Sequence, residues 1–158
     1  MATKKTQKEQ RNREVLAPKN LPYQIYLLSQ QLTRRFQEVL DEHKLTPLHW
    51  SILSCLWDED GLTASQIANC LEQLGGTITV GLNALQRRKL VVRRRDRNDG
   101  RVACIHLTVD GKQLQRKVVP RAGKAMQQMF VTLNDREYDA LRSGVSKLRK
   151  ELRDKTKD

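Results

Sequence analysis

The chain has 158 residues, of which 38% are hydrophobic and 30% are charged, and its formal net charge is +12. This length allows one domain with a hydrophobic core and extensions, and so large a positive excess favours a polyanionic partner, nucleic acid before an anionic membrane surface. The sequence lacks an apolar run of about 18 residues and an apolar signal segment, and its three cysteines are scattered. We therefore expect a cytoplasmic protein that binds no membrane, carries no secretion signal and has no disulfide framework.

The positive charge is concentrated in one segment. Residues 86–101 hold eight basic and two acidic residues, a net charge of +6, whereas residues 45–75 contain no Lys or Arg and carry a charge of −4. Like charges at this density repel one another unless an anion neutralises them, so the segment is typical of a docking surface for a polyanion. A solvated charged loop is the alternative interpretation.

The first half of the chain predicts two helices. Residues 1–20 are polar and basic, and we expect them to be disordered. From Leu21, apolar residues recur at spacings of three or four, which predicts a helix within residues 21–45. Thr46 followed by Pro47 is typical of an N-cap and the first helical residue, so a second helix begins there.

Two short helices with a tight turn follow. The sequence TASQ at 63–66 is a capping box and begins a helix over residues 63–73. Gly75 and Gly76 predict a sharp break, after which Gly76 or Thr77 caps a helix over residues 77–89. This spacing fits a helix-turn-helix, although many helix pairs with the same spacing do not contact DNA.

A basic hairpin comes next, in the sequence VVRRRDRNDGRVACIHLT at 91–108. Two apolar-rich strands flank the turn residues DRNDG. Because a helix-turn-helix followed at once by a basic hairpin defines a winged helix, the sequence predicts this fold over residues 46–108. The hairpin, residues 91–107, is called the wing below.

The remaining chain predicts two more helices. Thr108 caps a helix that runs to about residue 131, and Asn134 with Glu137 forms another capping box before a last amphipathic helix. The apolar stripes of the first helix and of the last two are longer than a small winged-helix core requires. We expect these helices to bury their stripes against a second copy, which gives a homodimer with two DNA-reading helices.

The helix over 77–89 carries side chains suited to base edges. Asn83 can pair with adenine, and Val80 can meet a thymine methyl group, with Thr77 and Thr79 beside them. For Thr77, helix capping alone is an equal alternative. Arg87 and Arg88 follow at positions suited to phosphates.

The wing arginines suit the minor groove and its phosphates. Side chains alternate across a strand, so Arg93 and Arg95 share one face and Arg94 takes the other. We expect Asp99 to pair with a nearby arginine inside the wing, and salt bridging within the wing is the alternative role for each arginine.

Other chemistries find little support in the sequence. The histidines, His43, His49 and His106, and the cysteines lack the spacings typical of metal sites. The sequence has no nucleophile–base signature and no phosphate-binding glycine loop. We expect no enzyme activity, no metal and no cofactor, and we expect Cys55, Cys70 and Cys104 to behave as small core hydrophobes.

The order of these segments and their amino-acid sequences resemble the MarR family of bacterial transcription regulators. The resemblance rests on LTPLHWSIL, LTASQIANCL, TITVGLNALQRRKLVVRRRDRNDGR, IHLTVDGKQL and TLNDREYDALRSGVSKL, and it covers about residues 21–152. It implies a homodimeric winged helix-turn-helix repressor that binds a pseudo-palindromic promoter site. Release by a small phenolic or other ligand, or by an oxidant, is also implied. By position, Arg101 is the wing arginine aimed at the minor groove, and Asp99 is its supporting carboxylate.

The sequence also departs from the family pattern. Val80 stands where an arginine is common, and Gly81 weakens the middle of the recognition helix by about 1 kcal/mol relative to alanine. Lys89 replaces a helix-ending glycine, and Gly100 replaces a basic residue at the wing tip, for which Arg94 and Arg95 compensate. The first helix has no cysteine and the last two have no histidine, which argues against the peroxide-sensing and zinc-sensing branches.

These interpretations define one architecture and one function. The fold is mostly α with a small β-hairpin wing, a winged helix-turn-helix flanked by dimerisation helices over 21–45 and 109–158. The function is sequence-specific binding of double-stranded DNA. A nonspecific or architectural nucleic-acid binder of the same fold is the first alternative. A helical protein-interaction module whose basic segment docks on an acidic partner or a membrane is the second.

Two groups of site residues follow. The expected DNA-binding residues are Ser65, Thr77, Thr79, Val80, Asn83, Arg87, Arg94, Arg95, Arg97 and Arg101. A small aromatic or phenolic effector is expected to meet Tyr23, Tyr26, His49 and Trp50, for which ordinary packing is the alternative role.

Overall fold

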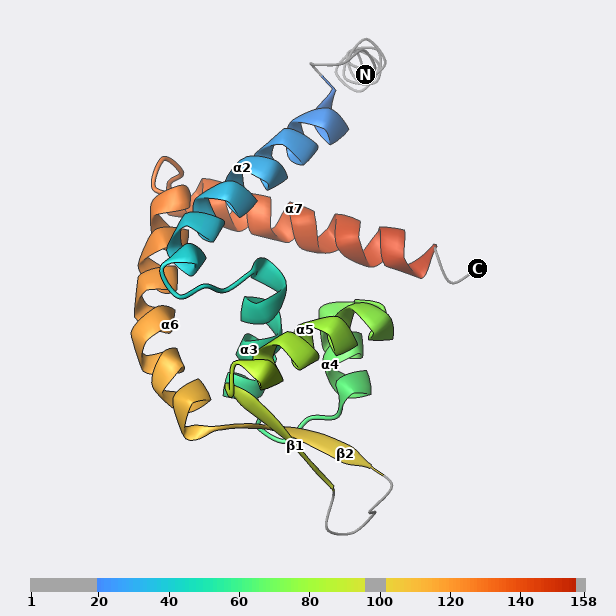
Figure 1. Cartoon of the computed structure of the whole chain (residues 1–158). Coiled ribbons are helices and arrows are strands. Elements are labelled where there is room, and N and C mark those ends of the chain that lie inside the picture. The colour runs from blue at the N-terminus through green and yellow to red at the C-terminus, as the bar shows by residue number, and fades with distance from the viewer. Residues whose placement is uncertain (1–19, 96–101, 156–158) are drawn as a thin grey trace, which may run out of the picture. The chain divides into compact units, whose positions relative to one another are not determined.

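The computed structural model describes residues 20–95 and 102–155 (Figure 1). Arg97, Asp99 and Arg101, on which part of the DNA-binding prediction depends, lie outside the described residues. The chain divides into two compact units, one up to Ala122 and one from Gly123 onward. Each unit is described by itself.

The first unit contains the helix-turn-helix and the wing strands. Its elements are α2 (Leu21–Asp41), α3 (Pro47–Asp58), α4 (Ala64–Leu71), α5 (Gly75–Arg87), β1 (Val91–Arg95), β2 (Ala103–Leu107) and α6 (Val109–Met129) as far as Ala122. The second unit holds the rest of α6 and α7 (Asp135–Asp154). The predicted order of helices and strands is confirmed in the described residues.

Side-chain caps begin most of these helices where the sequence predicts them. The Thr46 hydroxyl accepts from the His49 backbone N–H, and His49 Nδ1 accepts from the Thr46 backbone N–H at 3.2 Å. Thr63 with Gln66, and Asn134 with Glu137, form the two predicted capping boxes. Each pair satisfies two backbone donors that the helix itself leaves open.

Helix α5 begins differently from the prediction. It starts at Gly75 with Leu74 as its N-cap, and no side chain caps it. The turn between α4 and α5 is made instead by Glu72, which has a left-handed φ of 52°. The prediction of a break at Gly75 and Gly76, with Gly76 or Thr77 as the cap, is therefore wrong, because both glycines lie in the first turn of α5.

The core of the first unit forms around α3, which packs against α2, α4, α5 and β2. A Cβ atom at Gly81 of α5 would lie only 2.5 Å from Ile52 Cδ1 and 3.1 Å from Leu48 Cδ2 of α3. The glycine thus allows a close approach of α5 to α3. The packing therefore requires a glycine at a helical position where glycine is less favourable than alanine.

The wing is an antiparallel hairpin whose register separates its arginines. Arg93 lies opposite Ile105, and Arg94 lies opposite Cys104. Residues that face each other across an antiparallel pair share one side of the sheet. Arg93 therefore shares a side with the buried Ile105, while Arg94 takes the other, as the alternation predicts.

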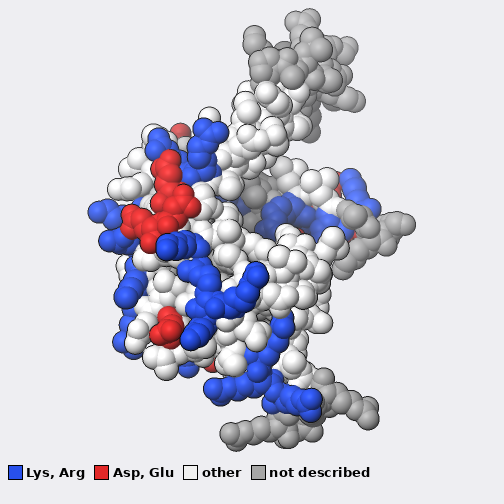
Figure 2. Space-filling model, in the orientation of Figure 1, with Lys and Arg blue, Asp and Glu red and all other residues white. Residues whose placement is uncertain are grey.

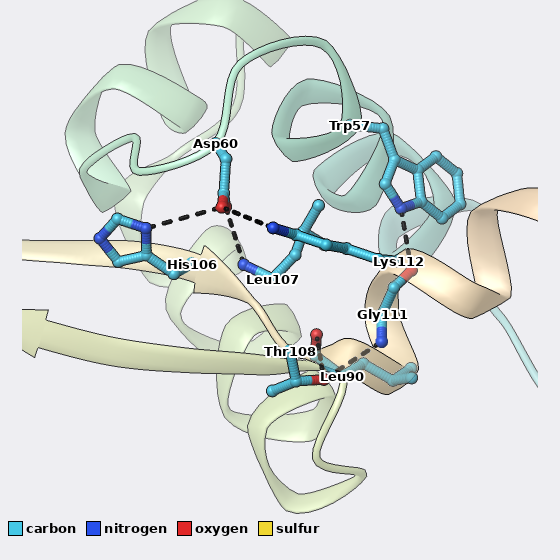
Figure 3. A network of polar contacts seen from close by, with 8 residues as sticks. All are labelled: Trp57, Asp60, Leu90, His106, Leu107, Thr108, Gly111 and Lys112. Carbon is cyan, nitrogen blue, oxygen red and sulfur yellow. Dashed lines mark hydrogen bonds and ion pairs between the residues drawn. The ribbon is translucent and has the colours of Figure 1, made fainter.

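A carboxylate from the loop after α3 secures the C-terminal end of the wing (Figure 3). Asp60 Oδ1 accepts from the backbone N–H of Leu107 at 2.8 Å. Asp60 Oδ2 lies 3.7 Å from His106 Nδ1 and 3.8 Å from Lys112 Nζ. This one side chain connects the loop after α3, strand β2 and the first turn of α6.

Thr108 joins the two ends of the wing to α6. Its backbone N–H donates to Leu90 O at 3.1 Å, and its hydroxyl lies 2.6 Å from Lys89 O. The same hydroxyl accepts from the Gly111 N–H at 3.1 Å, which confirms Thr108 as the cap of α6. Trp57 Nε1 donates to Gly111 O at 3.2 Å, so α3 is bound to the same junction (Figure 3).

The cysteines do not all behave as core residues. Cys55 is buried, Cys104 is intermediate and Cys70 is exposed. The prediction is wrong for Cys70, because the position is in the last turn of α4, beyond the face that Ile67 and Ala68 bury.

None of the helices described here is both long enough and apolar enough to cross a membrane.

Gly111→Ala should destabilise the protein strongly. A Cβ atom there would lie 2.2 Å from Leu90 O, a backbone atom that no rotamer change can move. We expect a loss of about 1–3 kcal/mol or more in the free energy of unfolding, measured by chemical denaturation. Gly123→Ala in the same helix is the control, since a Cβ there meets nothing within 4 Å, and we expect it to gain about 0.5–1 kcal/mol. Equal stability of the two variants would contradict the close contact at Gly111.

Candidate nucleic-acid interface

Helix α5 presents a polar and apolar face to solvent because its other face is buried. Ile78, Leu82 and Leu85 are almost completely buried in the core. Thr77, Thr79, Asn83 and Arg87 of the same helix are exposed, and Val80 is 67% exposed. The helix therefore displays most of the predicted base-reading side chains together.

The exposed face of α5 continues onto strand β1. Val80, Asn83, Gln86, Arg87 and Arg93 line a surface hollow of about 610 Å3, called the α5–β1 hollow below. One short apolar side chain, two amides and two guanidinium groups thus meet at one place. Such a set offers hydrogen-bond donors and acceptors for base edges and positive charge for phosphates.

The predicted DNA-binding set omits two residues of this hollow, Gln86 and Arg93, and Arg93 contacts α5 directly. Its Nη2 donates to Asn83 Oδ1 at 2.9 Å. The alternation of side chains along the strand could have predicted this position. It puts Arg93 on the same side as Val91, and β1 packs against α5. The contact also means that the Asn83 amide is oriented by the wing before any base is met.

Two threonines of α5 differ in the hydrogen-bonding groups that they can offer to a partner. The Thr79 hydroxyl donates to Gly75 O at 2.9 Å, so it can offer only its lone pairs to a further partner. Thr77 is exposed and does not cap the helix, so the capping alternative for it is wrong. Ser65, also predicted to bind DNA, is exposed in the first turn of α4.

Arg88 has a structural role instead of the phosphate role expected from the sequence. Its guanidinium donates to Lys44 O at 2.6 Å and to His43 O at 2.8 Å. These carbonyls belong to the turn that follows α2, so Arg88 joins the end of α5 to the end of α2. Arg87 remains exposed and keeps its predicted position on the α5–β1 hollow.

The described wing arginines are all exposed. Basic side chains gather at the lower end of the face in Figure 2, in the region where Figure 1 shows strand β1. Arg94 points to the side opposite Arg93 and Arg95, so a bound polyanion can be contacted from both sides of the strand.

The four expected effector residues differ in their exposure and in their contacts. The rings of Tyr23 and Tyr26 lie 6.2 Å apart on α2, and both are exposed. Trp50 packs edge-on against Phe36 at 5.3 Å and Trp57 at 5.4 Å, and His49 belongs to the capping box of α3. The alternative packing role thus has direct structural support for Trp50 and His49.

Within residues 20–95 and 102–155, no three side chains of the kinds that bind metal ions lie together. The sequence and the described residues give no donor set around which to build a metal centre.

Comparison with known proteins identifies the family. A family model described as MarR family matches residues 43–102. The chain is 33% identical over 134 residues to the HTH-type transcriptional regulator TtmR of Methylorubrum extorquens, covering 84% of this chain and 67% of TtmR. It is 30% identical over 103 residues to the organic hydroperoxide resistance transcriptional regulator of Bacillus subtilis, covering 65% of this chain and 70% of that protein. This chain belongs to the MarR family.

A solved structure agrees with this assignment. The transcriptional repressor CouR, bound to a 23-mer DNA duplex, matches with a TM-score of 0.71 and 27% identity over 82% of this chain and 92% of CouR. MarR-family proteins are DNA-binding transcriptional regulators, not enzymes. The predicted winged helix-turn-helix fold, the family and the non-enzymatic nature of the chain are therefore confirmed.

The free energy of unfolding should depend on pH through the titration of His49, which belongs to the capping box of α3. Burial, and secondarily the charge of Arg88, lower the pKa of His49. The unfolded chain then binds a proton near pH ~6.5 that the folded chain does not, so the free energy of unfolding falls as the pH drops below that value. His49→Gln keeps a cap acceptor and cannot titrate, and its stability should fall less over the same range.

Chemical denaturation at several pH values checks this. Above the pKa of histidine the difference in stability between the two proteins should not change with pH, because His49 is then neutral in both the folded and the unfolded chain. Parallel losses of stability in the wild type and in His49→Gln below pH ~6.5 would exclude His49 as the cause.

Proposed function

We propose that this protein is a homodimeric transcriptional repressor that reads a pseudo-palindromic promoter site through α5 and the wing. The observation that carries the proposal is the α5–β1 hollow, where Val80, Asn83, Arg87 and Arg93 meet. The likeness to a DNA-bound repressor, at 27% identity, supports it.

In this proposal α5 enters the major groove. Asn83 pairs with adenine, Val80 contacts a thymine methyl group, and Thr77 and Thr79 contact neighbouring base edges or phosphates, with Ser65 of α4 at the backbone. The high exposure of Val80, an apolar residue, supports a direct contact at this position. Arg93 acts with Asn83, because its contact sets the direction of the amide oxygen.

The remaining basic residues supply affinity. Arg87, Arg94 and Arg95 neutralise phosphates on either side of the grooves. Arg97 and Arg101 are proposed to reach the minor groove with Asp99 as the supporting carboxylate, a proposal that depends on the sequence and on the family resemblance.

The dimer proposal assigns residues 21–45 and 109–158 to dimerisation and residues 46–108 to DNA binding. It is supported by apolar side chains that the single chain leaves exposed on α2 and α7. Leu21 is 60% exposed and Ile25 46%, while Val145 is 46% and Leu148 48% exposed. No residue of α7 is buried in the single chain, so burial against a second copy would explain its apolar stripe.

We also propose that a small aromatic or phenolic effector binds near Tyr23, Tyr26, His49 and Trp50 and releases the DNA. The support is the exposure of the two tyrosine rings, 38% for Tyr23 and 53% for Tyr26, which leaves ring surface for stacking.

Selection from random duplex DNA at near-physiological salt tests the function. We expect enrichment of a two-fold-symmetric site, because a dimer carries two copies of α5 at a fixed separation. Retention of DNA without a common sequence would contradict a specific regulator and favour the architectural alternative. Failure to retain duplex DNA even at low salt would favour the interaction module that docks on an acidic partner or a membrane.

Arg94→Ala should weaken binding to all DNA sequences by a similar factor. The variant removes one phosphate contact, so the slope of log affinity against log salt should decrease in magnitude by about 1. Arg35→Ala is the matched control, because Arg35 is exposed on α2 and lies 3.5 Å from Glu38. Titration of labelled duplex at several salt concentrations measures both, and equal slopes for the two variants would remove Arg94 from the interface.

A further inference from the structure

Two cysteine thiols lie in contact between α3 and α4. Cys55 Sγ and Cys70 Sγ are 3.5 Å apart, and the two residues are separated by 15 positions in the chain. Helices α3 and α4 pack directly on each other, and the contact lies between these two helices. Neither thiol has a part in the DNA-binding surface described above.

The two thiols differ in their access to solvent. Cys55 is only 8% exposed, whereas Cys70 is exposed. Burial raises the pKa of the Cys55 thiol to about 12, and the hydrogen bond to Cys70 and the charge of Cys70 add to this effect. Cys55 therefore keeps its proton and donates it toward Cys70 Sγ, and a dissolved oxidant reaches Cys70 first.

We propose that Cys70 and Cys55 form an oxidation site for small peroxides, whose product is a disulfide that joins α4 to α3. The chemical class of the oxidant is hydrogen peroxide or an organic hydroperoxide. The site differs in place from the first helix, which contains no cysteine.

The reaction balances in two steps. The Cys70 thiolate attacks the terminal oxygen of the peroxide, the O–O bond breaks, and the leaving oxygen takes a proton as water or an alcohol. Cys70 is then a sulfenic acid. Cys55 Sγ attacks the Cys70 sulfur, the S–O bond breaks, and the leaving hydroxide takes the Cys55 proton to form water. Two electrons pass from the two thiols to one peroxide, and a thiol reductant reverses the change.

Formation of the disulfide requires a local movement. A disulfide has a sulfur–sulfur distance of about 2.05 Å, so the thiols must approach by well over 1 Å from their 3.5 Å contact. Cys70 lies in the last turn of α4, two residues before the left-handed Glu72 that turns the chain into α5. The movement therefore falls on the turn that positions the first residues of α5.

Peptide mapping of the full-length protein tests the chemistry. Residues 45–86 contain no Lys or Arg, so trypsin leaves both cysteines in one peptide, and cleavage after Glu59 and Glu72 then separates them. After hydrogen peroxide at mildly alkaline pH, we expect two of the three thiols to be lost. The peptides with Cys55 and Cys70 should be joined, at a mass lower by two hydrogen atoms, and dithiothreitol should separate them.

Two variants make the result specific. Cys104→Ser retains the pair and should still form the disulfide, while Cys70→Ser, at an exposed position, should leave Cys55 reduced. A disulfide between the Cys70 residues of two chains, or over-oxidation of Cys70 with Cys55 still reduced, would overturn the proposal.

A DNA-binding measurement examines the consequence, and this step alone rests on the proposed function. We expect the oxidised protein to bind its selected site at least about tenfold more weakly, a loss of about 1.4 kcal/mol that dithiothreitol restores and Cys70→Ser does not show. Absence of binding by the reduced protein would count against the proposed function, whereas unchanged binding by the disulfide form would overturn the coupling between the thiols and α5.

Discussion

The close packing of α5 on α3 determines how the DNA-binding surface is displayed. A side chain at Gly81 would collide with Ile52, and Ile78, Leu82 and Leu85 of α5 are buried in the core around α3. Because that face of α5 is buried, Val80, Asn83 and Arg87 on the remaining surface of the helix are exposed to solvent. The capped start of α3 and its contacts with α2, α4 and β2 then fix the helix on which α5 rests.

The basic wing is tolerated because its base is apolar and hydrogen-bonded. Val91 is 2% exposed and Ile105 1%, so the strands are held by buried side chains before the arginines begin. Asp60 and Thr108 add polar contacts at the same end of the hairpin. The repulsion among the arginines is thus opposed by a rigid attachment, and it is relieved fully only when an anion approaches.

Periodicity and capping chemistry were sufficient to predict the order of the elements. Thr63 with Gln66, and Thr108 before α6, use local hydrogen bonds that sequence neighbours determine, so their roles could be read from the chain. The start of α5 could not be read in this way. Gly75 and Gly76 can adopt either a turn or a helical conformation. The turn depends instead on Glu72, and a glutamate has no preference for the left-handed conformation that would predict it there.

The site was predicted in its types of residue more than in its individual contacts. Arg87 and Arg88 are equivalent in the sequence, and only the position of the turn after α2 makes Arg88 a ligand of backbone carbonyls. Arg93 and Asn83 are ten positions apart, and their contact requires the packing of β1 against α5. Long-range contacts of this kind are tertiary information, which local patterns do not contain.

The Arg88 contact has a mechanical consequence for helix α5. One end of this 13-residue helix is attached by two hydrogen bonds to the turn after α2, while the other begins without a side-chain cap at two glycines with open space around them. Because Ile78, Leu82 and Leu85 are buried along the helix, which is about 20 Å long, a displacement of the turn after α2 would move α5 together with the core on which it packs.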